Sequence, residues 1–301
     1  YSGYQSIAID NVHIDAPITL QQAPLTYLLY SSGSAIVSAC DATYSGEVII
    51  PATLTHEDKT YSVTQIGNSA FYNCDELIAI TIPSSVYSIG SNAFSSCDRL
   101  ALATLTAPTM EAYCHSSINN LLYNAGFTGS RAIQINGEEV YDIVVPEGIT
   151  TIGTRAFYNC DAINSVTIPA GVTTISSYAF NSCDGLTTIT IPSSISSIGS
   201  YAFSYCSSLS LATITAPTIE AYCNSNVNYE LYDNTSCPRK ILINGEEVTD
   251  IVIPEGITEI GERTFYNCDR LNSVVIPKSV ATIGYEAFYD CDALASVEIP
   301  M

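Results

Sequence analysis

The chain has 301 residues, of which 47% are hydrophobic and only 13% are charged, and its formal net charge is −21. This charge excludes a nucleic-acid backbone and an anionic membrane surface as natural partners, because like charges repel. No apolar run reaches the roughly 18 residues that a membrane-spanning helix needs. The hydrophobic content predicts a folded chain with a core, not a disordered one.

The first 46 residues lack the repeat that fills the rest of the chain. Three stretches rich in alternating or β-branched residues predict short strands at 6–14, 26–30 and 35–40. A stack of repeats leaves an apolar edge exposed at its end. We therefore expect residues 1–46 to form an N-terminal β cap over the first repeat.

From residue 47 onward, the motif Ile-Gly-x-x-Ala-Phe-x-x-Cys recurs with small variations, and its cysteines lie 23 residues apart within each run. Most copies are followed by Leu-x-x-Ile-x-Ile-Pro, which predicts one short strand per coil. A single coil of this length cannot enclose a core, but stacked coils cover one another's apolar edges.

The predicted fold of 47–301 is therefore a β-rich α/β solenoid, namely a leucine-rich-repeat right-handed superhelix of 23-residue coils. Its parallel strands would lie about 4.8 Å apart. The phenylalanines of the motif should then stack in one internal column, consisting of Phe71, Phe94, Phe157, Phe180, Phe203, Phe265 and Phe288.

Two similar segments, 106–145 and 215–253, interrupt the coils. Tyr113-Cys114 returns as Tyr222-Cys223, and the string Asn-Gly-Glu-Glu-Val occurs at both 136–140 and 244–248. Each segment is predicted to begin with a short helix and to end in a hairpin, because Asn-Gly favours primed turns. We interpret both segments as protrusions from the solenoid. The long repeat also predicts that the natural chain continues past Met301.

The coil pattern, together with the opening Tyr44-Ser45-Gly46-Glu47-Val48-Ile49-Ile50-Pro51, resembles the BspA-like bacterial surface-antigen leucine-rich repeats. The resemblance covers roughly 44–301 apart from the two interrupting segments. It implies a secreted or surface-exposed protein that binds host proteins, matrix or other cells, and it brings no catalytic residues with it.

The 11 cysteines are interpreted mainly as small buried space-fillers. A bridge between Cys223 and Cys237 stays open, since position 237 has no counterpart in the first segment. The aspartates that follow six motif cysteines are interpreted as turn caps, with a calcium ladder as the alternative. No Cys-x-x-Cys pair or carboxylate loop is present, so no metal and no cofactor is expected.

Candidate partner-binding residues fall into two groups. The small polar strand face offers Asn164, Ser165, Thr167, Thr187, Thr188 and Thr190. The hairpins carry Glu138, Glu139, Glu246 and Glu247, which are either solvated tips or contacts for a basic partner. Tyrosines after the motif phenylalanine either cover the column or make interface contacts, and these are Tyr72, Tyr158, Tyr266 and Tyr289.

The sequence thus predicts an extracellular or cell-surface binding or adhesion module that recognises host proteins, matrix or glycans through an extended surface. One alternative is a structural spacer that presents other parts of a longer surface protein, and a second is a cell-surface hydrolase. An enzyme is not expected, because His13, His56 and His115 share no motif with a nucleophile and an acid. Free cysteines alone would suit a reducing compartment equally well.

Overall fold

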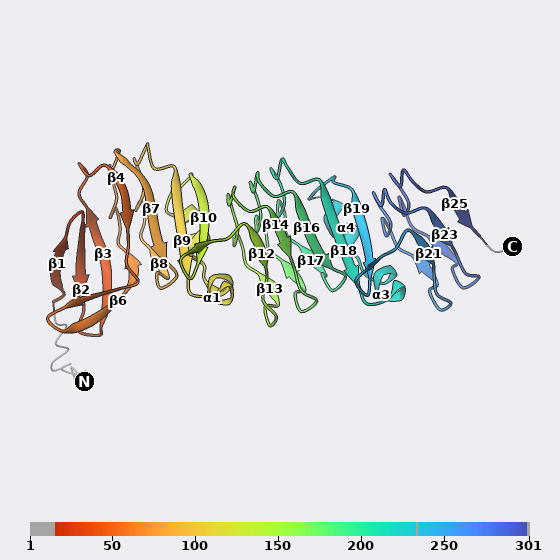
Figure 1. The fold of residues 1–301 in the computed structure, drawn as a ribbon, viewed down its shortest axis with the longest axis horizontal. Coiled ribbons are helices and arrows are strands. Elements are labelled where there is room, and N and C mark those ends of the chain that lie inside the picture. Colours follow the sequence, from red (N-terminus) through yellow and green to blue (C-terminus); the bar gives the residue numbers. More distant parts are fainter. Residues whose placement is uncertain (1–15, 233, 300–301) are drawn as a thin grey trace, which may run out of the picture.

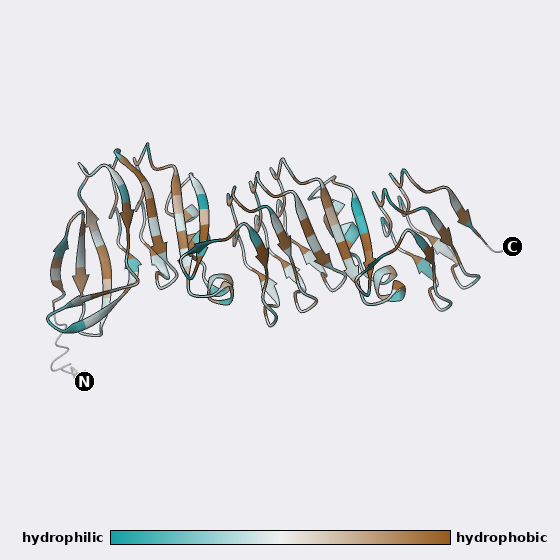
Figure 2. Ribbon diagram, in the orientation of Figure 1, coloured by the Kyte–Doolittle hydropathy of each residue, from teal (hydrophilic) through white to brown (hydrophobic). Residues whose placement is uncertain are grey.

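The computed structural model describes residues 16–232 and 234–299. It is an elongated stack of short strands, with the N-terminal sheet at one end and the last strand at the other (Figure 1). The expected strand at 6–14 lies outside the described residues. Hydrophobic residues alternate along the strands, and the loops between them are paler or hydrophilic (Figure 2).

The N-terminal sheet has the order β1-β2-β3-β6-β5, and β8 pairs with β6. It reaches beyond residue 46, because β3 pairs in parallel with a strand that lies after the first solenoid strand in sequence. The sheet consists of β1 (Ile18–Gln22), β2 (Leu25–Leu29), β3 (Ser34–Cys40), β5 (Thr53–His56), β6 (Lys59–Ile66) and β8 (Ser88–Ile89).

Three main sheets follow along the stack, and their neighbouring strands pair in parallel except at the two hairpins. The first sheet holds β4 (Gly46–Ile49), β7 (Leu77–Pro83), β9 (Leu102–Ala107), β10 (Ser130–Ile135) and β11 (Glu138–Glu139). The second holds β12 (Asp142–Val144), β14 (Ser165–Thr167), β16 (Thr188–Pro192), β18 (Leu211–Ala216), β19 (Arg239–Ile243) and β20 (Glu246–Glu247). The third holds β21 (Asp250–Val252), β23 (Ser273–Val275) and β25 (Ser296–Glu298).

Each regular coil contains a second strand of two residues, which the sequence did not predict. These strands coincide with the Ser/Thr-Ile or Glu-Ile that precedes the motif glycine, or Ser176 in one coil, and they form ladders of their own. They are β13 (Thr151–Ile152), β15 (Thr174–Ile175), β17 (Ser197–Ile198), β22 (Glu259–Ile260) and β24 (Thr282–Ile283). The Ala-Phe-x-x-Cys stretch forms turns on the way back to the next main strand.

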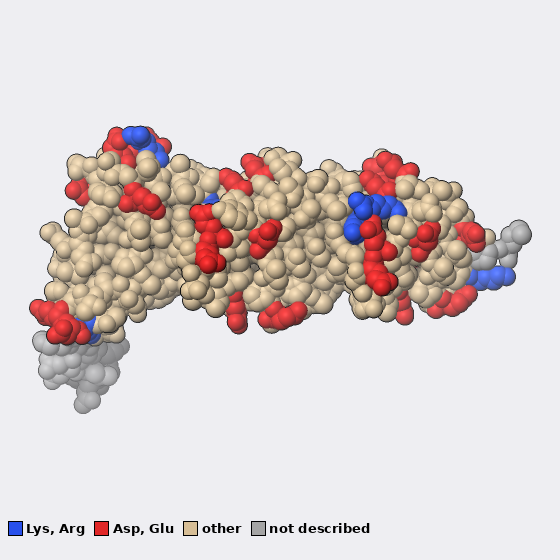
Figure 3. Space-filling model, viewed as in Figure 1, with Lys and Arg blue, Asp and Glu red and all other residues tan. Residues whose placement is uncertain are grey.

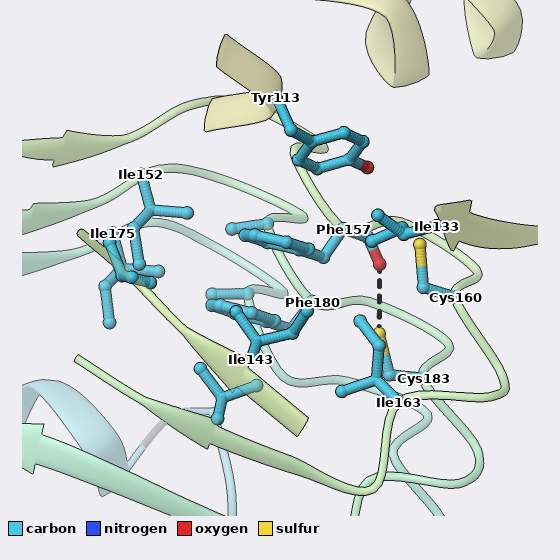
Figure 4. Packing of buried hydrophobic residues seen from close by; sticks show 14 of the residues in the cluster. Tyr113, Ile133, Ile143, Ile152, Phe157, Cys160, Ile163, Ile175, Phe180 and Cys183 are labelled. Atoms are coloured by element: carbon cyan, nitrogen blue, oxygen red, sulfur yellow. Dashed lines mark hydrogen bonds between the residues drawn. The ribbon is translucent and has the colours of Figure 1, made fainter. Parts of the chain in front are cut away.

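The motif phenylalanines stack inside the coils. Ring centroids lie 5.0 Å apart for Phe157 and Phe180 and 5.3 Å apart for Phe180 and Phe203. Figure 4 shows Tyr113 continuing this column above Phe157, and the two centroids are 5.5 Å apart. Where the regular coils stop, tyrosines from the interrupting segments therefore take over the aromatic column.

The description of 106–145 and 215–253 as protrusions was wrong for most of their length. Strands β10 and β19 inside these segments pair in parallel with β9 and β18, so they extend the main sheets. The helices replace the turn of an ordinary coil, and α1 and α3 occupy matching places below the sheets (Figure 1). The helices are α1 (Met110–His115), α2 (Ile118–Asn124), α3 (Ile219–Cys223) and α4 (Val227–Tyr232).

The helix and hairpin predictions within these segments are confirmed. Thr109 and Thr218 cap α1 and α3 by accepting a hydrogen bond from the backbone N–H three residues later. Asn136 and Gly137 both have positive φ, 52° and 84°, which is the conformation of a type I′ turn. The antiparallel β10–β11 hairpin closes over that turn.

Candidate functional site

The candidate residues of the strand face come together on the second main sheet. Ser165 lies opposite Thr188, and Thr167 lies opposite Thr190, in the parallel register of β14 and β16. Successive side chains in a strand point to opposite faces, and the intervening residues are buried in the core. The serine and threonines therefore form two rows on the outer face, and Thr213, opposite Thr190 on β18, is buried.

Asn164 and Thr187 precede these strands and hold each other in place. The Thr187 hydroxyl lies 3.0 Å from the backbone oxygen and 3.1 Å from the side-chain oxygen of Asn164. Ser210 repeats the pattern one coil later by donating to the Thr187 carbonyl at 3.2 Å. This edge of the face is thus rigid, since its polar groups bond across neighbouring coils.

Asp142, which the sequence groups with the hairpin glutamates as a solvated side chain or a contact for a basic partner, lies at the same edge as Asn164 and Ser165. Its Oδ1 accepts hydrogen bonds from Ser165 Oγ at 2.5 Å and from Asn164 Nδ2 at 3.2 Å. The hydrogen bond from Ser165, and to a smaller extent the one from Asn164, holds the pKa of Asp142 below its ordinary value. Asp250, its counterpart in the sequence repeat, makes the same pair of contacts to Ser273 and Asn272.

The four hairpin glutamates lie apart from the threonine rows. Glu246 and Glu247 form β20 at the edge of the second sheet, and Glu138 and Glu139 form β11 in the first sheet. The ten candidate residues therefore do not make one site. Figure 3 shows acidic columns near β10 and near β19, with a basic group beside the second column.

That basic group distinguishes the two hairpins. Glu247 pairs with Lys240 at 2.9 Å and with Arg270 at 3.1 Å, and these two cations hold its pKa below the ordinary value. Alanines stand at the corresponding positions of the first segment, 132 and 162. There Glu139 instead accepts a hydrogen bond from the Tyr141 hydroxyl.

A scan against protein-family models matches the BspA-type leucine-rich repeat region, in six copies, over residues 52–129, 135–242 and 235–301. The chain belongs to this family. The match covers most of the molecule, including most of both interrupting segments. No curated protein matches the chain in sequence.

Solved structures include similar leucine-rich repeat proteins. A leucine-rich cell surface protein from Faecalibacterium prausnitzii is 26% identical, with a TM-score of 0.43, and the match covers 95% of this chain and 77% of that one. A leucine-rich repeat protein from Bacteroides ovatus is 21% identical, with a TM-score of 0.32 and coverage of 92% and 94%. The pneumococcal vaccine antigen PcpA is 17% identical, with a TM-score of 0.36 and coverage of 95% and 71%.

The repeat cysteines of this BspA-type chain bond across coils. Cys183 Sγ lies 3.0 Å from the Phe157 carbonyl oxygen of the preceding coil, as the dashed line in Figure 4 marks. Burial raises the pKa of Cys160 and of Cys268 to about 12, which keeps both thiols protonated. All eleven cysteines are free, so the bridge left open between Cys223 and Cys237 is not formed.

Nowhere in 16–232 or 234–299 do three or more His, Cys, Asp or Glu side chains gather so that they could hold a metal ion. Of the described histidines, His56 ends β5 in the N-terminal sheet and His115 ends α1. His115 Nδ1 faces the Glu111 carbonyl oxygen at 2.9 Å. Among the described helices, none has the length and apolar character needed to cross a bilayer.

Proposed function

We propose that the chain is a bacterial cell-surface binding module that adheres to a host protein, matrix or glycan through the outer face of its second main sheet. Membership of the BspA-type family supports the surface location. We further propose that residues 47–301 form a right-handed superhelix of 23-residue coils and that residues 1–46 cap it.

The observation that carries the proposal is the register of the small hydroxyl side chains. Thr167 lies opposite Thr190, and Ser165 lies opposite Thr188, on the neighbouring strands β14 and β16. Such a row presents evenly spaced donors and acceptors on a rigid backbone, and little side-chain entropy is lost when a partner binds. Repeat solenoids characteristically bind through extended surfaces of this kind.

A spacer role and a hydrolase role make different predictions. A spacer would show no affinity for any surface ligand. A hydrolase would need a nucleophile, a base and an orienting group within hydrogen-bond reach of one another. His56 and His115 belong to different elements of the fold, so the binding role is the better supported.

The test compares two charge-matched double variants at physiological salt on matrix-protein and glycan arrays. Thr167→Glu with Thr190→Glu places two carboxylates in the middle of the proposed face. Thr173→Glu with Ser196→Glu places them beside the short-strand ladder, where both native side chains are exposed. We expect the first pair to abolish binding to matrix proteins and the second to preserve it. Equal binding by both variants would refute the strand face as the site.

Point variants are preferable to deletion of 106–145 or 215–253. Both segments contain main-sheet strands and aromatic rings of the internal column. Their removal would expose apolar coil edges, so a loss of binding could not be separated from unfolding.

A further inference from the structure

The two interrupting segments are related copies that have the same buried side. Helix α2 packs on β8, and α4 packs on β17. Residues 109 apart play the same internal role, since Ile118, Asn119 and Leu122 are buried in α2 and their counterparts Val227, Asn228 and Leu231 are buried in α4. The copies therefore hold their helices in the same way.

Their exposed sides differ. Asn120, Leu121 and Ala125 of the first copy correspond to Tyr229, Glu230 and Asn234 of the second, and Asn92 in the coil before the first copy corresponds to Tyr201. Tyr201, Tyr229, Glu230 and Asn234 line a hollow of about 390 Å³ together with Ile198 and Ser200. We call this the α4 hollow. Its volume falls within the range of about 300–1,000 Å³ that small-ligand sites occupy.

The polar groups of the α4 hollow are fixed by the coil on which the helix lies. Glu230 Oε2 accepts the Ile198 backbone N–H at 2.9 Å, and Oε1 accepts from Asn226 Nδ2 at 3.3 Å. Asn234 Oδ1 accepts the Ala202 N–H at 2.9 Å. A carboxylate oxygen can accept more than one hydrogen bond, so Glu230 keeps acceptor capacity for a ligand in a preset orientation.

The aromatic groups are exposed and ordered. Tyr201 is 55% exposed and Tyr229 is 45% exposed. Tyr201 stacks on Tyr178 with a centroid distance of 5.3 Å. Arg155 lies over the Tyr178 ring at 4.8 Å, and Arg263 lies 5.6 Å from the Tyr229 ring. The stacked rings of Tyr178 and Tyr201 thus hold Tyr201 in place at the α4 hollow.

The two stacked tyrosines occupy a costly backbone conformation. Tyr178 and Tyr201 both have φ of 60°, in the left-handed region that bulky residues rarely adopt. The coil before the first copy has Asn92 at the position of Tyr201, with φ of 55°, and asparagine tolerates this region much better. The same position has positive φ in the other coils, 53° at Ser69 and 56° at Arg155, so this conformation belongs to the coil turn and fixes the direction of the Tyr201 side chain.

We propose that the α4 hollow binds a sugar ring of a neutral glycan. The C–H face of a pyranose carries partial positive charge, which complements the negative face of the Tyr201 or Tyr229 ring. The hydroxyl groups of the sugar donate to Glu230 and exchange hydrogen bonds with Ser200 and Asn234. An acidic sugar is disfavoured beside Glu230 on a chain of net charge −21. This site rests on the proposed binding function and adds to it a second contact surface, which lies at α4 and not on the outer face of the second main sheet.

The experiment applies the full chain to an array of neutral and sialylated glycans and measures the affinity of the best neutral binder by calorimetry. We expect Tyr201→Asn with Tyr229→Asn, which introduces the residues found at the corresponding positions of the first copy and the coil before it, to weaken binding by about tenfold or more. Glu230→Gln retains one oxygen for the Ile198 N–H and should weaken binding by a similar factor. Sialylated glycans should bind more weakly than their neutral parents.

Tyr72→Ala is the matched control, because Tyr72 is also 55% exposed but lies on an ordinary coil. Unchanged affinity in the Tyr201/Tyr229 double variant, equal loss with Tyr72→Ala, or no neutral glycan bound at all would each overturn the assignment. The Thr167→Glu, Thr190→Glu variant separates the two proposals. Glycan binding that survives it, together with loss of a matrix ligand, supports both sites independently.

Discussion

Each regular coil places a phenylalanine and a cysteine inward, and in four coils the cysteine thiol bonds to the preceding coil. The Sγ–carbonyl contact of Cys183 recurs at 2.9–3.0 Å in three further coils, for Cys97 to Phe71, Cys206 to Phe180 and Cys291 to Phe265. A small apolar residue with a weak donor suits this site, because it fills space and gives the phenylalanine carbonyl of the preceding coil a hydrogen-bond donor.

These thiols should make the fold sensitive to alkaline pH. Burial raises the pKa of Cys160 and Cys268 from an ordinary 9.0 to about 12. Between pH 9 and about pH 12, these two thiols are deprotonated in the unfolded chain but stay protonated in the folded chain. The free energy of unfolding should therefore be unaffected below pH 9 and fall above it, by about 1.4 kcal/mol per pH unit for each thiol.

Urea unfolding under reducing conditions, from pH 8 to pH 11, measures this dependence. The control is Cys160→Ala with Cys268→Ala, in which two titrating groups are gone. It should show a shallower decline above pH 9 than the native sequence. Identical slopes for the two proteins would contradict the assignment.

The loss of stability on replacing a column phenylalanine with alanine should depend on its position in the column. Phe180 is fully buried, with rings 5.0 Å and 5.3 Å away on its two sides. Phe180→Ala should lower the free energy of unfolding by about 3–5 kcal/mol, because it removes a packed ring and leaves a cavity. Phe288 is only partly buried, so Phe288→Ala should cost less. Denaturant midpoints of the two variants check the order, and equal losses would argue against it.

At the level of elements, the interrupting segments rely on two buried arginines. Arg131 donates to the carbonyls of Phe127 and Gly129, and its guanidinium lies 4.8 Å from the Phe127 ring and 5.0 Å from the Tyr158 ring. Arg239 makes the corresponding contacts to Cys237 and Thr235. A planar fork can satisfy two carbonyls while stacking on rings, which an ammonium group cannot do.

We therefore expect Arg131→Lys to be nearly as harmful as Arg131→Ala. Either change should cost about 2–4 kcal/mol, since buried carbonyls lose charged donors and cation–π contacts disappear. Thermal unfolding followed by circular dichroism measures the loss. Arg99→Ala is the control, because the Arg99–Glu76 pair is solvent-exposed and should contribute at most about 1 kcal/mol. Full rescue by lysine would show that charge alone matters.

Sequence reasoning predicted the helices and hairpins of these segments but not that their strands join the main sheets. The coil period, the short helices and the Asn-Gly hairpins all follow from local patterns that repeat. The return of β10 to the sheet depends on distant contacts, such as the Arg131 N–H bonded to the Asn159 carbonyl at 2.8 Å. The α4 hollow could not be predicted from sequence for the same reason, because only the placement of helix α4 brings Tyr201 and Glu230 together.

For the whole molecule, the breaks between the main sheets are places where cooperative unfolding could stop. The first and second sheets meet at a junction where the Tyr113 hydroxyl donates to the Ala156 carbonyl at 2.8 Å. Asn119 Nδ2 donates there to the Ala156 and Tyr158 carbonyls at 3.3 Å and 3.1 Å. The second junction repeats this arrangement with Tyr222, Asn228 and Thr264. In a stack where each repeat contacts only its neighbours, such interfaces set how far unfolding spreads.

Tyr113→Phe combined with Asn119→Ala removes these hydrogen bonds while keeping the aromatic ring. It should weaken the first junction by about 2–3 kcal/mol. We expect hydrogen exchange to show residues 16–135 opening separately from the remainder, because the coils on either side stay intact while their coupling falls. Phe180→Ala lies within the second sheet's coils and should lower protection there without splitting the molecule at residue 135. If the junction variant instead lost protection evenly along the whole stack, the sheet break would not be a boundary between cooperative units.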